Sequence, residues 1–188
     1  PDVVDRRALD LPEILTIIQQ LIVGGNETTT KMLGEMMRNL ALAPELWQRL
    51  RTDPSLIPNV VEEAVRFCSP IQAIWRAATQ DVELGGVLIP KGSRLVIVFG
   101  SANRDETVFV DGDAFDPDRA HLSDHLGFGR GVHFCVGASL ARLEGRVALE
   151  ELTRRVASIS LADTNEFTYH DSFMLRGLLK LDLHVVPA

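Results

Sequence analysis

The chain has 188 residues, of which 46% are hydrophobic and 24% are charged, and its formal net charge is −7. These proportions are typical of a folded globular protein and exclude a disordered chain. The acidic balance gives no support for a nucleic-acid partner, which is bound by clustered Lys and Arg, and no apolar run reaches the roughly 20 residues of a membrane-spanning helix.

The first predicted element is a long helix over residues 11–42, in which apolar residues recur at helical spacing. Asp10 suits the N-cap and Pro12 suits the first turn. The run Gly24-Gly25-Asn26-Glu27-Thr28-Thr29-Thr30 interrupts this pattern, because Gly and β-branched Thr are unfavourable inside a helix. Such an interruption indicates a kink, a close approach of the backbone to another group, or a functional site.

Two shorter helices and a sheet are predicted next. One helix begins at Pro44 and runs through residue 50, and the other covers residues 59–68 and ends before Pro70. Residues 71–99 alternate strand-like apolar runs with two Gly-containing turns, which predicts a small antiparallel sheet.

The last third begins with a long irregular stretch. Residues 100–135 are rich in Gly, Asp, Asn and Pro and show little periodicity, which is uncommon unless the segment is functional. A helix is predicted over residues 136–156, followed by strands chiefly over residues 178–186. Helices with small sheets and no regular βαβ alternation predict a mainly α fold with small antiparallel β-sheets.

The two cysteines have different surroundings. No CxxC pair or zinc-type Cys/His spacing is present, so we predict a reducing, cytoplasmic location. Cys68 is predicted to be an inert core residue. Cys135 lies in a Gly-rich run just before a helix start, where backbone N–H groups stabilise a thiolate. This arrangement suits a large planar metal cofactor, and the alternative is a buried Cys in a turn.

Residues 128–137 have the pattern F-G-x-G-x-H-x-C-x-G and resemble the haem-binding loop of the cytochrome P450 superfamily, in its soluble bacterial form. The resemblance implies haem b as cofactor and Cys135 as the axial thiolate ligand of its iron. It implies that His133 contacts a haem propionate, and the alternative is a hydrogen bond that orients the loop. The other loop residues that it assigns to cofactor binding are Phe128, Gly129 and Gly137.

Two further segments extend the resemblance along the chain. Glu63 and Arg66 match the family's E-x-x-R motif, which together with Arg119 forms a structural site rather than a catalytic one. Arg76 matches a position that binds a haem propionate, and its alternative is a solvated strand residue. His125 is a weaker propionate candidate or a structural residue.

The interrupted helix resembles the family's distal helix, through the segment [AG]-G-x-[DE]-T-[TS]. The resemblance implies that Gly24 and Gly25 let the helix pass close over the haem and open slightly. Glu27 and Thr28 match the acid and the alcohol that deliver protons for oxygen activation. The alternative for this segment alone is a helix kink with capped carbonyls.

The acid–alcohol pair favours a haem-thiolate monooxygenase that inserts one atom of dioxygen into an apolar substrate. Electrons are then expected from NAD(P)H through a ferredoxin and its reductase. Five Arg against three Glu in residues 126–157 suit the steering of an acidic partner, unless they form only a solvated helix face. A lipophilic substrate pocket, or equally core packing, is predicted for Val23, Ile74, Phe173 and Met174.

Two alternatives remain open at this point. One is a catalytically incomplete or non-enzymatic protein that binds haem or serves as a structural partner, and the other is a peroxide-using variant. Chains of the resembled family are about twice as long, so residues 1–188 are expected to be the C-terminal, haem-ligating half of one larger domain, with the N-terminal half absent.

Overall fold

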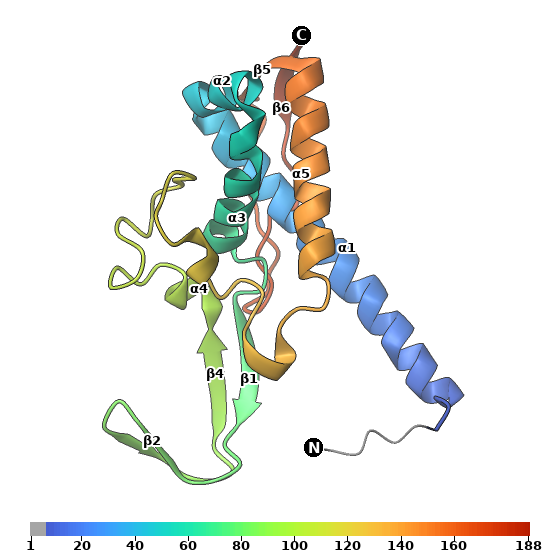
Figure 1. The fold of residues 1–188 in the computed structure, drawn as a ribbon, viewed down its shortest axis with the longest axis vertical. Coiled ribbons are helices and arrows are strands. Elements are labelled where there is room, and N and C mark those ends of the chain that lie inside the picture. Colours follow the sequence, from blue (N-terminus) through green and yellow to red (C-terminus); the bar gives the residue numbers. More distant parts are fainter. Residues whose placement is uncertain (1–6) are drawn as a thin grey trace.

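The computed structural model describes residues 7–188, so the first six residues of the predicted domain lie outside the described range. These residues form helices and three two-stranded antiparallel sheets, which confirms the predicted fold class (Figure 1). The helices are α1 (Leu11–Leu42), α2 (Pro44–Thr52), α3 (Ile57–Cys68), α4 (Phe99–Ala102) and α5 (Ala138–Arg155). The strands are β1 (Ala73–Ala77), β2 (Val82–Leu84), β3 (Val87–Ile89), β4 (Arg94–Val98), β5 (Val156–Leu161) and β6 (Leu183–Pro187). Short 3₁₀ turns are η1 (Pro54–Leu56), η2 (Leu122–Asp124) and η3 (Gly131–His133).

Helix α1 starts where its capping residues predict. The Asp10 side chain accepts a hydrogen bond from the Glu13 N–H, and the Glu13 side chain accepts one from the Asp10 N–H, which forms a capping box. The helix is continuous from residue 11 to residue 42, the range predicted for it, and the unfavourable run at residues 24–30 remains helical. A Gly costs only about 1 kcal/mol relative to Ala in a helix, which a 32-residue helix tolerates.

The core forms where the C-terminal half of α1 meets α2, α3 and α5 (Figure 1). Its fully buried side chains include Met36, Leu40, Leu50, Val60 and Leu149. Gly145 allows α5 to approach closely, because a Cβ at that position would lie 2.9 Å from the Val61 Cγ1 atom. The core therefore holds α5 against α3.

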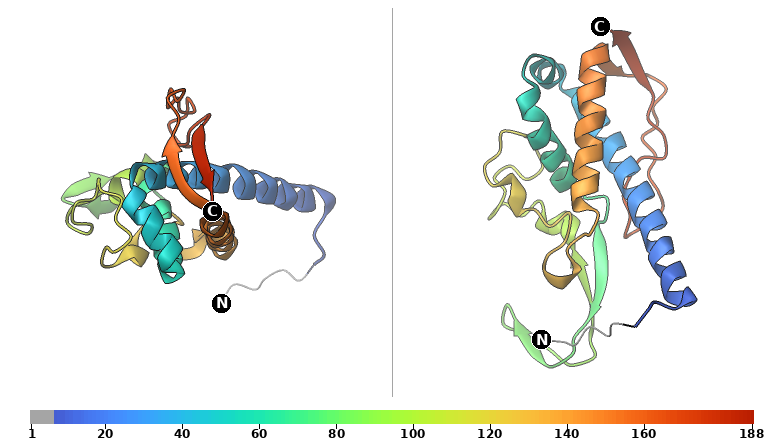
Figure 2. Two further views of the ribbon diagram at one scale, coloured as in Figure 1. Left: turned by 90° about the horizontal axis from the view of Figure 1, so that it is seen from above. Right: turned by 45° about the vertical axis from the view of Figure 1, so that its right-hand side comes forward.

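The N-terminal half of α1 projects away from this core (Figures 1 and 2). Its apolar side chains are exposed; they are Leu11, Ile14, Leu15, Ile17, Ile18, Leu21, Ile22 and Val23. Within residues 7–188, no helix is long and apolar enough to cross a membrane. The exposed apolar residues of α1 form a continuous helix surface on which no other residue of the range 7–188 packs closely enough to bury them.

The strands pair differently from the prediction in two places. The single sheet predicted over residues 71–99 is instead two separate pairs, β1 with β4 and β2 with β3, because β2 and β3 form a hairpin that extends away from the β1–β4 pair (Figure 1). The last predicted helix ends at Arg155, and residues 156–161 form β5, which pairs with β6. The β-branched residues Val156 and Ile159 are buried in this pair, which favours a strand over further helix.

Candidate functional site

The loop that carries Cys135 is closed by its own backbone. The Cys135 N–H donates to the Phe128 carbonyl at 2.9 Å, and the Phe134 N–H donates to the Gly131 carbonyl at 3.0 Å. Gly129 has a φ of 69°, in the left-handed region that favours glycine. These bonds present Cys135 as a free, exposed cysteine three residues before α5 begins.

Apolar side chains surround this thiol without being buried. Val132 is 97% exposed, Val136 is 93% exposed, and Phe134 is half exposed. Within residues 7–188, no group of three or more His, Cys, Asp or Glu could hold a metal ion. A single thiolate among exposed apolar side chains is unsuited to zinc, which takes several protein ligands, but it suits an iron carried by a large apolar macrocycle. The donor set of this loop therefore fits haem.

The predicted proton-delivery residues lie on the projecting part of α1. The Thr28 hydroxyl donates to the Gly24 carbonyl at 2.6 Å, which fixes its direction and leaves its lone pairs free to accept. Glu27 is exposed and makes no side-chain hydrogen bond with residues 7–188. A Cβ added to Gly24 or Gly25 would meet no atom within 4 Å, so this stretch of α1 borders open space.

Arg76 lies on β1, at the edge of an open pocket of about 590 Å³ that Trp75, Ala77 and Arg94 also line. Its Nη1 atom donates to the Trp75 carbonyl at 2.9 Å, and its other guanidinium donors have no hydrogen-bond partner within residues 7–188, so they can bind a carboxylate. His133 ends η3 with an exposed side chain, in the loop that precedes α5 (Figure 1). No hydrogen bond or ion pair within residues 7–188 joins His133 to Arg76.

The predicted substrate-pocket residues are brought together in part. The Gln72 N–H donates to the Met174 carbonyl at 2.8 Å, and the Phe173 ring packs against Trp75 with centroids 6.3 Å apart. These contacts place the turn at residues 172–175 beside β1, which carries Ile74. Val23 lies on the exposed part of α1.

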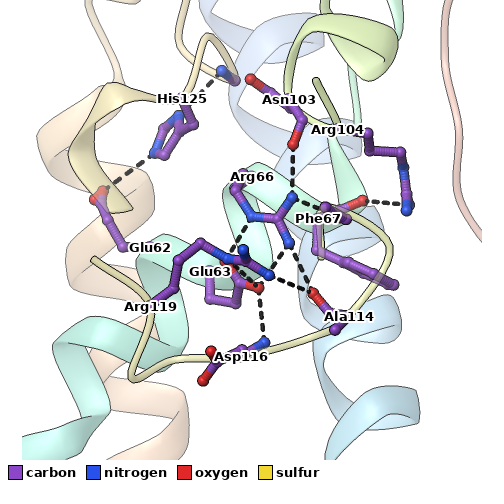
Figure 3. Close-up of polar contacts among 12 residues, drawn as sticks. Glu62, Glu63, Arg66, Phe67, Asn103, Arg104, Ala114, Asp116, Arg119 and His125 are labelled. Carbon is purple, nitrogen blue, oxygen red and sulfur yellow. Dashed lines mark hydrogen bonds and ion pairs between the residues drawn. The ribbon is translucent and has the colours of Figure 1, made fainter. Parts of the chain in front are cut away.

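The E-x-x-R pair forms the centre of a buried polar network (Figure 3). Arg66 donates to both Glu63 carboxylate oxygens at 2.7 Å, and both side chains have 0% exposure. The remaining Arg66 donors reach the carbonyls of Asn103, Gly112 and Ala114. The Arg119 Nε atom lies 3.7 Å from Glu63.

This network explains how residues 99–119 are ordered with few regular elements. Five of their carbonyl groups accept hydrogen bonds from the guanidinium groups of Arg66 and Arg119 rather than from a helix or sheet; they belong to Asn103, Val110, Asp111, Gly112 and Ala114. Since the Glu63 and Arg66 side chains are fully buried and bonded to the protein itself, the pair is structural, as the resemblance implies.

A second polar cluster, Glu62 with His125 and Arg142, was not assigned from the sequence. His125 is 5% exposed, and its Nε2 atom lies 3.6 Å from Glu62 (Figure 3). Arg142 donates to both Glu62 oxygens at 2.6 and 2.9 Å. Burial raises the pKa of Glu62, but the hydrogen bonds from His125 and Arg142 outweigh it, so this pKa lies below its ordinary value. The position of His125 supports the structural alternative.

The predicted basic surface around α5 is largely paired with acids. Each of its five arginines lies within 4.0 Å of a carboxylate oxygen: Arg130 with Asp124, Arg142 with Glu62, Arg146 with Glu150, and Arg154 and Arg155 with Glu151. Hydrogen bonding to Arg154 lowers the pKa of Glu151. Exposed pairs of this kind exchange readily with solvent, so they can also re-pair with an incoming acidic surface.

Comparison with known proteins gives concordant matches. The sequence profile of the family described as "Cytochrome P450" matches residues 3–158. Cytochrome P450 CYP199A2 of Rhodopseudomonas palustris is 43% identical over 172 residues, covering 92% of this chain and 41% of that protein. The 6-deoxyerythronolide B hydroxylase of Saccharopolyspora erythraea is 38% identical over 175 residues, covering 93% and 43%.

A solved structure matches the fold as well. The structure of CYP109E1 from Bacillus megaterium in complex with corticosterone superposes with a TM-score of 0.89 at 35% identity, covering 96% of this chain and 48% of that one. The chain therefore spans about two fifths of the length of the curated relatives named above and about half of this solved chain.

Proposed function

Because the chain belongs to the cytochrome P450 family, we propose that it is the C-terminal, haem-ligating part of a larger monooxygenase domain, with Cys135 as the axial thiolate ligand. The observation that carries this proposal is the exposed Cys135 thiol on a closed Gly-rich loop, among exposed apolar side chains. When bound, haem b would supply the iron at which dioxygen is activated for insertion into a C–H bond.

The chain's own residues would act around this iron in three ways. Cys135 would donate electron density as a thiolate, three residues before the N-terminus of α5, whose backbone N–H groups would favour a negative charge there. Arg76 and His133 would orient the cofactor by binding its carboxylates, while Phe128, Gly129 and Gly137 would line its proximal side. Glu27 would supply a proton, and the Thr28 oxygen would accept a hydrogen bond from a water molecule that carries this proton toward the oxygen site beside Gly24 and Gly25.

Electrons would come from NAD(P)H through a ferredoxin and its reductase. The arginines of α5 and its preceding loop support a docking surface for an acidic ferredoxin, because their intrachain partners are exposed and can be displaced. Two free cysteines, with the pKa of Cys68 raised chiefly by burial, support a reducing, cytoplasmic location.

The substrate would be a lipophilic small molecule. The turn that carries Phe173 and Met174 lies beside Ile74, and all three side chains are apolar. The related CYP109E1, which was solved with corticosterone, supports this substrate class. Val23 would contribute from α1, above the oxygen site.

Isotope-labelled dioxygen tests this function against the alternatives. In the intact protein supplied with NADPH, ferredoxin and reductase, label from dioxygen is expected in the hydroxylated product of a lipophilic test substrate. Labelled hydrogen peroxide without electron donors is expected to give much less labelled product. A product labelled only from peroxide would favour the peroxide-using variant, and no labelled product under either condition would favour the non-enzymatic alternative.

A further inference from the structure

The cluster Glu62–His125–Arg142 connects helix α3 to the loop that carries Cys135. We infer that His125 and Glu62 are positioning residues, which hold the Cys135 loop in the orientation that haem ligation needs. This inference rests on the proposed ligation by Cys135.

His125 joins the two elements through its two ring nitrogens (Figure 3). Its Nδ1 atom accepts a hydrogen bond from the Gly127 N–H at 3.0 Å, and its Nε2 atom lies 3.6 Å from the Glu62 carboxylate. A ring that accepts at Nδ1 carries its proton on Nε2, so the N–H group faces the carboxylate. One buried ring therefore links the loop backbone to α3.

Glu62 is in turn held by α5. Arg142 donates from Nε to both Glu62 oxygens, and its guanidinium lies over the Phe128 ring, 4.5 Å from the centroid. Arg142 and His125 therefore approach the carboxylate from two sides, Arg142 through hydrogen bonds and His125 at 3.6 Å, which holds the carboxylate in place. Arg142 therefore packs on Phe128, and the carbonyl of Phe128 accepts the hydrogen bond from the Cys135 N–H group.

Residues 125–128 are fixed at further points. The Leu126 N–H donates to the Asn103 side chain at 2.6 Å, and the His125 and Phe128 rings pack with centroids 5.8 Å apart. Gly127 packs directly on α3, because a Cβ there would lie 2.6 Å from Val65 Cγ1. The Cys135 backbone is attached to this segment by the hydrogen bond that its N–H group donates to the Phe128 carbonyl at 2.9 Å.

Three substitutions separate the two functions of the ring. His125→Asn keeps an acceptor near the Nδ1 position and loses the donor toward Glu62. His125→Phe keeps a ring of similar size and loses both groups, and Glu62→Gln keeps the shape but removes the charge. His121→Asn is the matched control, because His121 is exposed on the same segment and Asn tolerates its φ of 59°.

The first measurement is amide hydrogen exchange at Gly127 and Cys135 in the intact protein, with no haem added. His125→Phe is expected to speed exchange at both amides about fivefold, the effect of one lost hydrogen bond, while His125→Asn restores most of the protection at Gly127. Amides in the middle of α3 and the His121→Asn variant are expected to match the wild type. Unchanged exchange in His125→Phe, or an equal increase throughout α3, would overturn the inference.

The second measurement is the reduced, CO-bound absorption spectrum after haem is supplied. His125→Phe and Glu62→Gln are expected to convert part of the thiolate-type spectrum to the neutral-thiol type, with less conversion in His125→Asn. A fully thiolate-type spectrum in His125→Phe would contradict the inference. A wild-type protein without a thiolate-type spectrum would refute the proposed ligation by Cys135, and the amide exchange would still decide whether His125 positions the loop.

Discussion

Thr28 has the most defined geometry among the proposed catalytic residues. Its hydroxyl donates to the Gly24 carbonyl at 2.6 Å, so the hydroxyl proton is already used within the helix. The oxygen lone pairs then point away from that bond and can accept a hydrogen bond from a water molecule. A hydroxyl held in this way orders a proton path without itself being consumed.

Thr28→Ala is expected to uncouple electron consumption from product formation. Without the hydroxyl, water reaches the oxygen site unordered, so product formed per electron pair should fall about tenfold or more. The measurement is the ratio of hydroxylated product to NADPH oxidised in the intact protein. Thr28→Ser keeps the hydroxyl and should retain most of the coupling, whereas wild-type coupling in Thr28→Ala would contradict the assignment.

Glu62 should make stability depend on pH on the acid side. Burial raises its pKa, but the bonds from His125 and Arg142 outweigh burial and hold it below its ordinary value of 4.5. The unfolded state therefore binds the proton first as pH falls. The stabilisation is fully present above about pH 4.5 and is lost as pH falls through the lower folded pKa.

Urea unfolding at a series of pH values measures this effect in Glu62→Gln. The variant should lose stability at neutral pH and show a flatter decline toward acid than the wild type. Glu106→Gln removes an exposed carboxylate and serves as the control. If the free energy of unfolding falls with decreasing pH equally steeply in the wild type and in Glu62→Gln, Glu62 does not contribute to the loss of stability in acid.

At the scale of elements, α3 organises the irregular residues 99–119 through Arg66. Arg66→Met would leave the buried Glu63 carboxylate without its hydrogen-bonded charged partner and would leave the Asn103 and Gly112 carbonyls without their side-chain donor. Loss of one partner of a buried pair costs about 3–5 kcal/mol, which denaturant unfolding measures. Arg49→Met is the control, since it breaks only the exposed ion pair with Asp118 and should change the free energy of unfolding by less than about 1 kcal/mol. A change as small as this in Arg66→Met would contradict the structural role of the buried pair.

The glycines of α1 give a second prediction at this scale. Gly25→Ala should stabilise α1 by about 0.5–1 kcal/mol, because Ala favours the helix and the new methyl meets no atom within 4 Å. In the intact, haem-loaded protein the same methyl would face the oxygen site, so turnover should fall. Thermal unfolding of residues 7–188 measures the change in stability, and the turnover rate of the intact protein measures the effect on the site. An unchanged turnover rate in Gly25→Ala would show that Gly25 does not lie at the oxygen site.

Local signals in the sequence account for most of the elements. Asp10, Pro44 and the Gly-containing turns lie next to the residues whose structure they determine. The errors concern long-range contacts. Whether β2 and β3 join the β1–β4 pair depends on tertiary packing, and β5 forms only because β6 pairs with it.

The candidate site divides in the same way. The Cys135 loop and the Glu63–Arg66 pair were predicted because their residues are neighbours in sequence. The Glu62–Arg142 bond joins residues 80 positions apart, and no local pattern marks it. The unfavourable run at residues 24–30 indicated a functional site, which stays a prediction, and the structure shows that both glycines lie within a continuous helix.

At the scale of the whole molecule, the exposed apolar surface of α1 dominates the expected behaviour of this chain. The surface runs over the N-terminal half of the helix and includes Leu21 and Ile22, each more than 60% exposed. Contiguous apolar surface of this kind promotes association. It is consistent with a chain that spans about two fifths of the length of its curated relatives.

Residues 7–188 on their own are therefore expected to self-associate in a concentration-dependent way, as sedimentation velocity would show. Replacing Leu21 and Ile22 together with Glu should shift the distribution toward monomer, because charged side chains would line the apolar surface. Leu179→Glu is the control, since Leu179 is an equally apolar, exposed residue that does not belong to α1. A monomeric wild-type chain at all concentrations would contradict this expectation.

The central claim is that Cys135 ligates haem iron as a thiolate, and the reduced, CO-bound absorption spectrum of the intact protein tests it most directly. The wild type is expected to give the thiolate-type spectrum, and Cys135→Ala is expected to lose it, while Cys68→Ala keeps it because Cys68 is buried in the core. A histidine-type spectrum in the wild type, or an unchanged spectrum in Cys135→Ala, would contradict the account.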